Sequence, residues 1–184
     1  KMSDKGLYSI SKPDLAKWIT KTIISNLNQT EKFIKNNFII TDATAGLGGD
    51  TLYFSKHFKY VNAIEIDNTH FNILKHNLNN VLKIKNVKYY NSDYNIIYDK
   101  LKNNVVYFDP PWGGKNVSKI KDVMLNLGGN KIYVIINKLY KNNIKNIFLK
   151  IPHNFNYYLF FYKVKYNKIS LYKNKKVYLL HLTK

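Results

Sequence analysis

The chain has 184 residues, 45% of them hydrophobic, and contains no cysteine. Its length suits one hydrophobic core, so we expect a single domain over residues 1–184, with residues 1–37 as a helical extension packed on it. The missing cysteines exclude disulfides, thiolate nucleophiles and thiolate metal sites. The net charge of +19, carried by lysine without arginine, favours a polyanionic partner, although codon bias in an AT-rich genome would also enrich lysine.

Signals for membrane insertion and metal binding are missing from the sequence. No apolar run is long enough to cross a bilayer, and the first residues lack the apolar region of a signal peptide. We therefore expect a soluble, intracellular monomer, cytoplasmic or nuclear, without membrane contact. The histidines show no metal-ligand spacing, so we expect no metal: they are His57, His70, His76, His153 and His181.

Apolar spacing and turn residues predict the first elements of the chain. A helix is predicted within Tyr8–Leu27, with Ser11 as its N-cap and Pro13 in its first turn. The elements that follow have the order of a βαβ unit. They are a strand at Phe38–Asp42, a glycine-rich turn, a helix at Asp50–His57 and a strand at Tyr60–Asp67.

Helices and strands continue to alternate in the rest of the chain. The predicted elements are helices at Asn68–Asn80, Tyr94–Leu101 and Val117–Leu127, strands at Val87–Tyr90, Val105–Phe108, Ile132–Ile136, Tyr157–Tyr166 and Val177–Leu182, and a turn at Gly128–Asn130. The run Lys173–Lys176 is most simply a hairpin turn, with nucleic-acid contact as the alternative. This order predicts an α/β fold: a mostly parallel central sheet with helices on both faces and an antiparallel C-terminal strand pair.

A glycine-rich turn, Thr44-Ala45-Gly46-Leu47-Gly48-Gly49, follows the first predicted strand. Ligands of open α/β sheets bind beyond the carboxyl ends of the strands, where glycines let the backbone come close. An ordinary tight turn has the same pattern, but two carboxylates strengthen the binding interpretation. Glu65 ends the next strand and can accept from both hydroxyls of a ribose, and Asp93 ends the strand after that and can accept from an adenine amino group.

The turn also indicates which kind of cofactor it binds. It lacks the Gly-x-Gly-x-x-Gly pattern of nicotinamide sites, and the chain has no Gly-Lys-Ser/Thr for a nucleoside triphosphate. An adenosine with a methionine tail fits better, because its ammonium and sulfonium groups would explain Asp42 just before the glycines. For Asp50 and Thr51, helix capping is an equally good explanation.

The segment Asp109-Pro110-Pro111-Trp112-Gly113-Gly114 follows a predicted apolar strand. Its two prolines make the turn stiff. An exocyclic amine of a nucleic-acid base is a poor nucleophile because its lone pair is delocalised into the ring. If the Asp109 side chain and the Pro110 carbonyl accept its hydrogens, the lone pair turns toward a methyl donor and the developing charge is stabilised.

Trp112 has two interpretations. It can stack on the base and hold it in line for displacement at the methyl carbon, with Gly113 and Gly114 leaving room for the ring. Alternatively, it is a core residue beside a Pro-Pro loop, since tryptophan is usually buried. Its position after a strand of the same predicted sheet as the glycine-rich turn favours the first interpretation.

These residues resemble class I S-adenosylmethionine-dependent methyltransferases, and among them the trimethylguanosine synthases, which methylate N2 of the 7-methylguanosine cap of RNA. The matching segments occur in order and cover most of the chain: Tyr8-Ser9-Ile10-Ser11, Asp42 to Thr51, Ala63-Ile64-Glu65-Ile66-Asp67, Ser92-Asp93-Tyr94 and Asp109 to Gly114. Pro-Pro-Trp-Gly-Gly is the most specific of them. The chain departs from the pattern at Lys115, where a proline often stands, and Asp109 takes a position where serine or aspartate is expected.

The resemblance implies a Rossmann-like fold, S-adenosylmethionine as cofactor and capped RNA as partner. The implied cofactor site consists of Ser11, Asp42, Thr44, Ala45, Gly46, Gly48, Gly49, Glu65, Ile66, Asp93, Tyr94 and Asp109, with Ser11 near the methionine end. The implied catalytic residues are Asp109, Pro110 and Trp112. The base would contact Trp112, Gly113, Gly114 and Lys115.

We therefore predict an S-adenosylmethionine-dependent RNA cap guanine-N2 methyltransferase that forms di- or trimethylguanosine caps. The first alternative is an adenine-N6 or non-cap guanine-N2 methyltransferase acting on DNA or RNA, because adenine-N6 enzymes also use Asp-Pro-Pro-Trp. The second is an inactive nucleic-acid-binding module on a methyltransferase fold, which the lysine surplus suggests but the presence of Asp109 disfavours.

Overall fold

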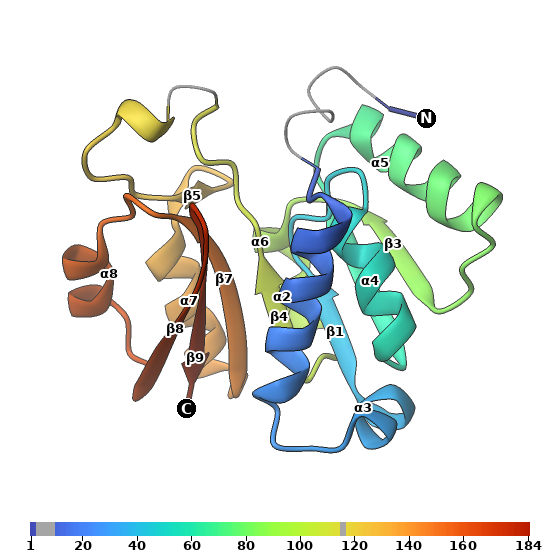
Figure 1. Cartoon of the computed structure of the whole chain (residues 1–184), viewed down its shortest axis with the longest axis horizontal. Helices are drawn as coiled ribbons and strands as arrows, with labels where there is room; N and C mark the ends of the chain where they lie inside the picture. Colours follow the sequence, from blue (N-terminus) through green and yellow to red (C-terminus); the bar gives the residue numbers. More distant parts are fainter. Residues whose placement is uncertain (3–9, 115–116) are drawn as a thin grey trace. The chain divides into compact units, whose positions relative to one another are not determined.

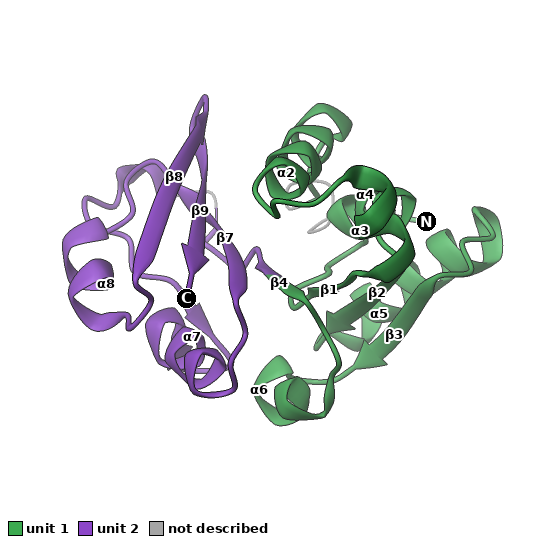
Figure 2. Ribbon diagram, turned by 90° about the horizontal axis from the view of Figure 1, so that it is seen from below, with its two compact units in different colours: residues 1–106 green, residues 107–184 purple. Residues whose placement is uncertain are grey.

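The structure is a computed structural model that describes residues 1–2, 10–114 and 117–184. It contains two compact units, residues 1–106 and residues 107–184, which Figure 2 draws in different colours. Among the described residues, no helix is both long enough and apolar enough to span a lipid bilayer.

The strands form one main sheet with the order β3-β2-β1-β4-β7-β9-β8. Their bounds are β1 Ile39–Asp42, β2 Tyr60–Glu65, β3 Val87–Asn91, β4 Val105–Phe108, β7 Asn146–Pro152, β8 Lys168–Asn174 and β9 Val177–Thr183. The pairs β1–β2 and β2–β3 are parallel, whereas β9 is antiparallel to both β7 and β8. The predicted fold class, a mostly parallel α/β sheet with antiparallel C-terminal strands, is confirmed.

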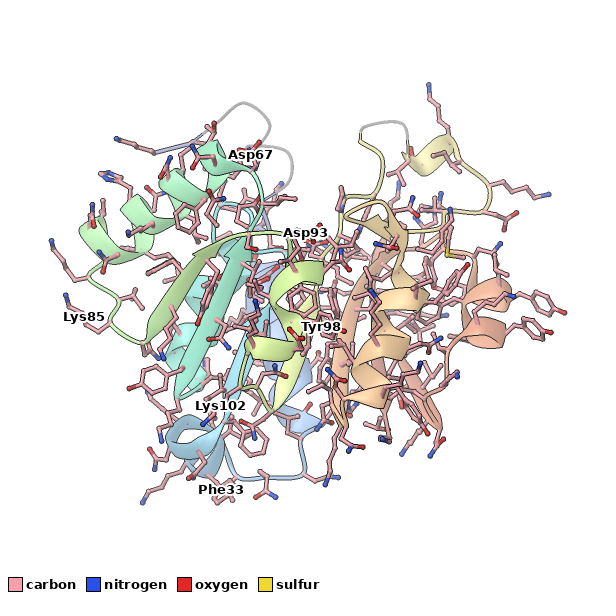
Figure 3. All side chains as sticks on the ribbon, turned by 180° about the vertical axis from the view of Figure 1, so that it is seen from behind. Phe33, Asp67, Lys85, Asp93, Tyr98 and Lys102 are labelled. Atoms are coloured by element: carbon pink, nitrogen blue, oxygen red, sulfur yellow. The ribbon has the colours of Figure 1, made fainter. Side chains whose placement is uncertain are left out.

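In unit 1, strands and helices alternate as consecutive βαβ motifs. The helices between its strands are α4 Gly49–His57, α5 Asn68–Lys75, the π-helical turn η1 His76–Val81, α6 Tyr94–Ile97 and the 3-10 turn η2 Tyr98–Lys100. Figure 1 shows α4 in front of the strands, and Figure 3, from behind, shows the segment with Asp93 and Tyr98 in front of them. Unit 1 therefore has helices on both faces of its strands, because crossovers in the two directions along a parallel sheet lie on opposite faces.

Among the described residues, the helices α2 Pro13–Ser25 and α3 Glu31–Asn37 precede the first strand of unit 1. The predicted helix α2 is confirmed, with Pro13 at its start, but the prediction that Ser11 is its N-cap is wrong. The N-cap is Lys12, which makes no side-chain capping bond, and the Ser11 hydroxyl donates to the Asp50 carboxylate. Helix α3 was not predicted, since it buries only Ile34 and gives a weak apolar signal.

Unit 2 differs most from the sequence prediction. The predicted strand Ile132–Ile136 is the first half of helix α7, Ile132–Lys141. Four buried residues, Ile132, Ile135, Ile136 and Leu139, follow a spacing of three and four, which is the period of a helix. Over five residues, the β-branched isoleucines favour a strand. Over the ten residues of α7, the spacing of the buried residues is that of a helix, and the segment is helical.

The predicted helix Val117–Leu127 is also wrong. Only Val117–Lys119 is helical, as the 3-10 turn η3, and the segment then ends in a small hairpin of β5 Asn126–Leu127 and β6 Asn130–Lys131. Distant backbone explains the difference, because Val123 pairs with Phe155 in an isolated parallel bridge. Tertiary pairing here overrides local helix propensity.

The last predicted strands are partly right. Tyr157–Tyr166 is instead helix α8, Tyr157–Lys163, whose N-cap Asn156 accepts from the backbone N–H of Leu159. Strand β9 confirms the predicted strand at Val177–Leu182, whereas β7 and β8 were not predicted. The hairpin turn in Lys173–Lys176 is confirmed, since Asn174 pairs with Val177 across it.

His181 of β9 is a buried titratable residue in unit 2. Its side chain is 5% exposed, its Nε2 lies 3.0 Å from Asn146 Oδ1, and its ring stacks on Phe148 with centroids 4.1 Å apart. Burial, with a smaller contribution from Lys168, lowers the pKa of His181 from 6.5 to about 4. Loss of solvation disfavours the protonated ring, so the folded protein keeps this imidazole neutral.

This lowered pKa predicts acid sensitivity. Below pH 6.5 the unfolded chain takes up a proton on His181, whereas the folded chain resists protonation down to about pH 4. The contribution of His181 to the free energy of unfolding should be constant above pH 6.5 and should fall as the pH decreases from 6.5 to about 4. Urea unfolding at pH 7 and pH 5 measures the difference, and His181→Gln should reduce it. The same difference in both proteins would contradict the prediction.

Candidate active site

The glycine-rich turn of unit 1 joins β1 to α4 and is fixed by backbone hydrogen bonds. The Ala45 N–H donates to the Ile64 carbonyl of β2, and the Gly48 N–H donates to the Ala45 carbonyl, both at 2.8 Å. Gly46 has φ +53°, and a Cβ added to it would meet nothing within 4 Å. The turn is thus held rigidly while open space lies above Gly46.

Glu65, at the end of β2, connects this turn to the neighbouring strand. Its Oε2 accepts from the Gly46 N–H at 2.8 Å, and its Oε1 accepts from the Asp67 N–H at 2.7 Å. The residue is 9% exposed, so its carboxylate is nearly buried at the carboxyl end of the strand. The next residue, Ile66, is 62% exposed and offers an apolar surface beside that carboxylate.

Two further carboxylates lie where β1 ends and α4 begins. The Thr51 hydroxyl donates to Asp42 Oδ2 at 2.6 Å, and the Ser11 hydroxyl donates to Asp50 Oδ2 at 2.8 Å. Both carboxylates are buried. A Cβ on Gly49 would lie 2.9 Å from the Ser11 carbonyl oxygen, so glycine is needed for this approach. The structure therefore brings Ser11 next to the glycine-rich turn.

Asp93 follows β3 and is the N-cap of α6. Its Oδ1 accepts from the Asn95 N–H at 2.9 Å. Tyr94 is 1% exposed and belongs to the core of unit 1, and Thr44 is partly exposed. In Figure 3, Asp67 and Asp93 lie towards one end of unit 1 and Lys102 towards the other. Asp42 ends β1, Glu65 ends β2 and Asp93 follows β3, so the three carboxylates lie at the same end of adjacent parallel strands.

Unit 1 fits an adenosine with a methionine tail. Three carboxylates lie at the strand ends, where they can accept from hydroxyl and amino groups, and Gly46 leaves space that a larger residue would fill. The carboxylate of Asp42 next to the turn suits a cationic tail better than a phosphate. Among the described residues, no cluster of three or more His, Asp or Glu side chains could hold a metal ion.

The segment Asp109-Pro110-Pro111-Trp112-Gly113-Gly114 begins directly after β4 and belongs to unit 2. Lys150 of β7 donates from Nζ to Asp109 Oδ2 at 2.7 Å. The two side chains are 6% and 19% exposed, respectively, so this ion pair is largely shielded from water. Pro110 is buried and Pro111 is exposed.

Trp112 is partly buried beside this ion pair. The Lys150 Nζ lies 5.8 Å from the centroid of the Trp112 ring, within range of a cation–π interaction. In the part of the chain that the structure describes, the buried indole N–H of Trp112 has no hydrogen-bond partner. Gly113 and Gly114 have φ values of +97° and +84°, and a Cβ on either would meet nothing within 4 Å. Lys115 lies outside the described residues.

Lys150 is the residue that the sequence analysis missed. It stands inside the apolar run Ile147-Phe148-Leu149-Lys150-Ile151, whose members are all buried. A single charge within an apolar strand is a signal of a paired or functional group, because burying an unpaired ammonium is costly. That signal could have identified Lys150, but the strand itself was not predicted.

The comparisons with known structures place the fold among class I methyltransferases. An rRNA methylase from Streptococcus thermophilus superposes with a TM-score of 0.62 at 15% identity, covering 95% of this chain and 98% of that one. A Streptococcus mutans protein solved in complex with SAH gives 0.65 at 18% identity, covering 95% and 99%. The 16S rRNA N2 methyltransferase of T. thermophilus, in complex with AdoMet and guanosine, gives 0.71 at 15% identity, covering 96% and 45%.

Sequence comparison then gives the family. A family profile described as RNA cap guanine-N2 methyltransferase matches residues 37–179, and the chain belongs to that family. It is 35% identical over 150 residues to an uncharacterized protein of Acanthamoeba polyphaga mimivirus, a match that covers 79% of this chain. It is 30% identical over 117 residues to the trimethylguanosine synthase of Schizosaccharomyces pombe, covering 60% of this chain.

The chain spans about half the length of these two relatives, 58% and 45% respectively. Family and fold together identify S-adenosylmethionine as the cofactor. Both agree with the resemblance seen in the sequence.

The Asp109–Lys150 pair leads to a stability prediction. Lys150→Met removes the ammonium that pairs with the shielded Asp109 carboxylate. We therefore expect the free energy of unfolding to fall by about 3 kcal/mol. Asp109→Asn combined with Lys150→Met should recover most of that loss. The measurement is urea unfolding, with exposed Lys141→Met as the control, which should change stability by less than about 0.5 kcal/mol. Equal losses for Lys150→Met and Lys141→Met would show that the pair contributes nothing.

Proposed function

We propose that this chain transfers a methyl group from S-adenosylmethionine to N2 of the 7-methylguanosine cap of RNA. The main support is the segment Asp109-Pro110-Pro111-Trp112-Gly113-Gly114 at the end of β4, within a chain of the RNA cap guanine-N2 methyltransferase family. The +19 net charge is consistent with an RNA substrate. Capped RNA is accordingly the proposed partner.

In unit 1, residues at the strand ends would hold the cofactor. Glu65 would accept from the ribose hydroxyls, because each of its oxygens is aimed by one backbone N–H and retains a further lone pair. Asp93 would accept from the adenine amino group, and Ile66 would cover the ring. Ser11 and Asp42 would face the methionine end, and the open side of Gly46 would admit the cofactor.

Further contacts with the cofactor come from the glycine-rich turn and its surroundings. Thr44, Ala45, Gly48 and Gly49 would line the turn, and Tyr94 would support it from the core. Bound S-adenosylmethionine supplies an electrophilic methyl group on a sulfonium centre. The chain itself then has to bring the acceptor nitrogen into line with that group and exclude water.

In unit 2, the catalytic segment would activate the acceptor amine. The Asp109 carboxylate and the Pro110 carbonyl would accept the two hydrogens of the guanine N2 amine, directing its lone pair and stabilising the positive charge that develops on nitrogen. Lys150 holds Asp109 Oδ2 at 2.7 Å, which orients the carboxylate before the substrate arrives. The new bond from nitrogen to the methyl carbon would replace the carbon–sulfur bond, whose electron pair stays on sulfur, and the nitrogen would then release one proton to water.

Trp112 would hold the base by stacking. A 7-methylguanine carries a positive charge, and an indole face attracts cationic rings. Gly113 and Gly114 leave the space beside the ring open, since a Cβ on either would meet nothing. Lys115 remains a proposed contact to the cap phosphates.

The alternative acceptors differ in the base. Adenine N6 is one alternative acceptor, because the Asp109 carboxylate can also accept a hydrogen from an adenine amine. A guanine N2 amine outside a cap is the other candidate, with the same chemistry. An inactive nucleic-acid-binding module is disfavoured because Asp109 is present and paired with Lys150.

A substrate comparison tests the proposal. The protein would be incubated with methyl-labelled S-adenosylmethionine and, separately, 7-methylguanosine diphosphate, guanosine diphosphate and adenine-containing oligonucleotides. We expect transfer to the first substrate, with mass analysis giving the number of methyl groups. Transfer only to the oligonucleotides would refute the cap substrate. Cofactor binding in calorimetry without transfer to any acceptor would support the inactive module.

Two substitutions should separate cofactor binding from base binding. Trp112→Ala should reduce methylation of 7-methylguanosine diphosphate by about 10²-fold and leave the calorimetric affinity for S-adenosylmethionine nearly unchanged, because stacking contributes about 1–3 kcal/mol and also aligns the base. Glu65→Gln should weaken cofactor affinity first. If Trp112→Ala weakened the cofactor as much as Glu65→Gln does, Trp112 would be a core residue and not a base contact.

A further inference from the structure

Helix α8 has an aromatic outer surface that the proposed chemistry does not use. Tyr158 is 87% exposed, Phe161 45% and Tyr162 76%. Positions i, i+3 and i+4 share one side of a helix, so these three rings form a continuous surface, which we call the aromatic face. Phe160 is fully buried against Phe155, with ring centroids 5.1 Å apart, and anchors the opposite side of the helix. Figures 1 and 2 draw α8 at the margin of unit 2.

Lysines border the aromatic face. The Lys163 Nζ lies 5.2 Å from the Tyr162 ring centroid, and Lys165 is exposed just after the helix. The charge of the whole unit is one-sided: residues 107–184 contain half of the chain's 30 lysines and only two carboxylate side chains, Asp109 and Asp122. Asp109 is already paired with Lys150. The surroundings of the face therefore attract a polyanion.

We propose that the aromatic face binds the single-stranded body of the RNA, stacking on its bases while Lys163 and Lys165 contact its phosphates. Single-stranded nucleic acids are bound in this way, by exposed rings interleaved with basic side chains. A protein partner is disfavoured, because lysine is depleted in protein interfaces whereas it is abundant here. The inference rests on the proposed function only in taking RNA as the nucleic acid.

Hydrogen bonds connect the start of α8 to the segment that follows the Asp109–Gly114 motif in the chain. The Asn154 side chain donates from Nδ2 to the carbonyls of Val117 and Ile120, just beyond the Asp109–Gly114 motif. The backbone N–H of Asn156, the N-cap of α8, donates to the Val123 carbonyl at 2.9 Å. The start of α8 and the segment after the motif thus form one frame, so RNA held on α8 is held by the structure that carries the proposed base contact.

The test measures RNA binding separately from cap chemistry. The variant Tyr158→Ser, Phe161→Ser, Tyr162→Ser would be titrated with a fluorescent, uncapped 12-nucleotide RNA and compared with the parent protein and with Phe33→Ser, an exposed aromatic control in unit 1. Each lost stacking contact weakens binding, so we expect at least a tenfold loss of affinity, and no loss for Phe33→Ser. With 7-methylguanosine diphosphate, kcat/KM should stay unchanged, whereas KM for capped RNA should rise.

A second variant protects the test against misfolding. Lys163→Gln combined with Lys165→Gln leaves the rings in place and should reduce the salt dependence of RNA affinity by about two ion equivalents. Unchanged RNA affinity in both variants would overturn the proposal. A change in self-association of the triple variant without a change in RNA affinity would overturn it too, by making the face a protein contact. Loss of RNA binding in a protein that methylates no cap analogue would refute only the proposed function.

Discussion

The buried carboxylate of Glu65 is the contact on which the proposed cofactor site in unit 1 depends. A glycine-rich turn has backbone N–H groups that need acceptors, and a flexible turn would not present a defined surface. Glu65 accepts from one N–H in the turn and from one just after its own strand, so β1, β2 and the turn are fixed together. The flexibility that Gly46 allows is thereby converted into one conformation with open space above it.

In unit 2, a buried ion pair has a comparable role at the Asp109–Gly114 segment. Asp109 is shielded from water and held by Lys150, which comes from a different strand and also lies near the Trp112 ring. In a shielded site, an acceptor with a fixed direction stabilises developing charge better than a mobile one, because it needs no reorganisation. The stiff Pro-Pro turn and this ion pair both fix the direction of the acceptor groups. The turn does so through the backbone, and the ion pair does so through charge.

The two units also divide the charge of the chain. Unit 1 holds all the acidic residues except Asp109 and Asp122, and its buried carboxylates gather around the glycine-rich turn. Unit 2 is strongly basic and carries exposed aromatic rings on α8. Carboxylates suit the hydroxyl and amino groups of a cofactor, whereas lysines suit phosphates. Both units hold the same number of lysines, so the excess of positive charge in unit 2 comes from its small number of carboxylates.

The sequence by itself determined the βαβ core, the glycine-rich turn, the positions of Glu65 and Asp93 at strand ends, and the family. These features depend on local patterns: apolar runs, glycines after a strand, and a short motif with two prolines. The sequence did not predict the contacts between residues of the site, such as the hydrogen bond between Glu65 and Gly46.

Only the tertiary structure decided unit 2. There, backbone pairing between Val123 and Phe155 replaced a predicted helix, and α7 and α8 formed where β-branched and aromatic residues favoured strands. The sequence predicts Ser11 as a helix cap, whereas in the structure its hydroxyl donates to Asp50 of α4. Lys150 pairs with Asp109 because β7 lies beside the end of β4 in the fold. The two residues are 41 positions apart in the sequence, too far for a local pattern to predict the contact.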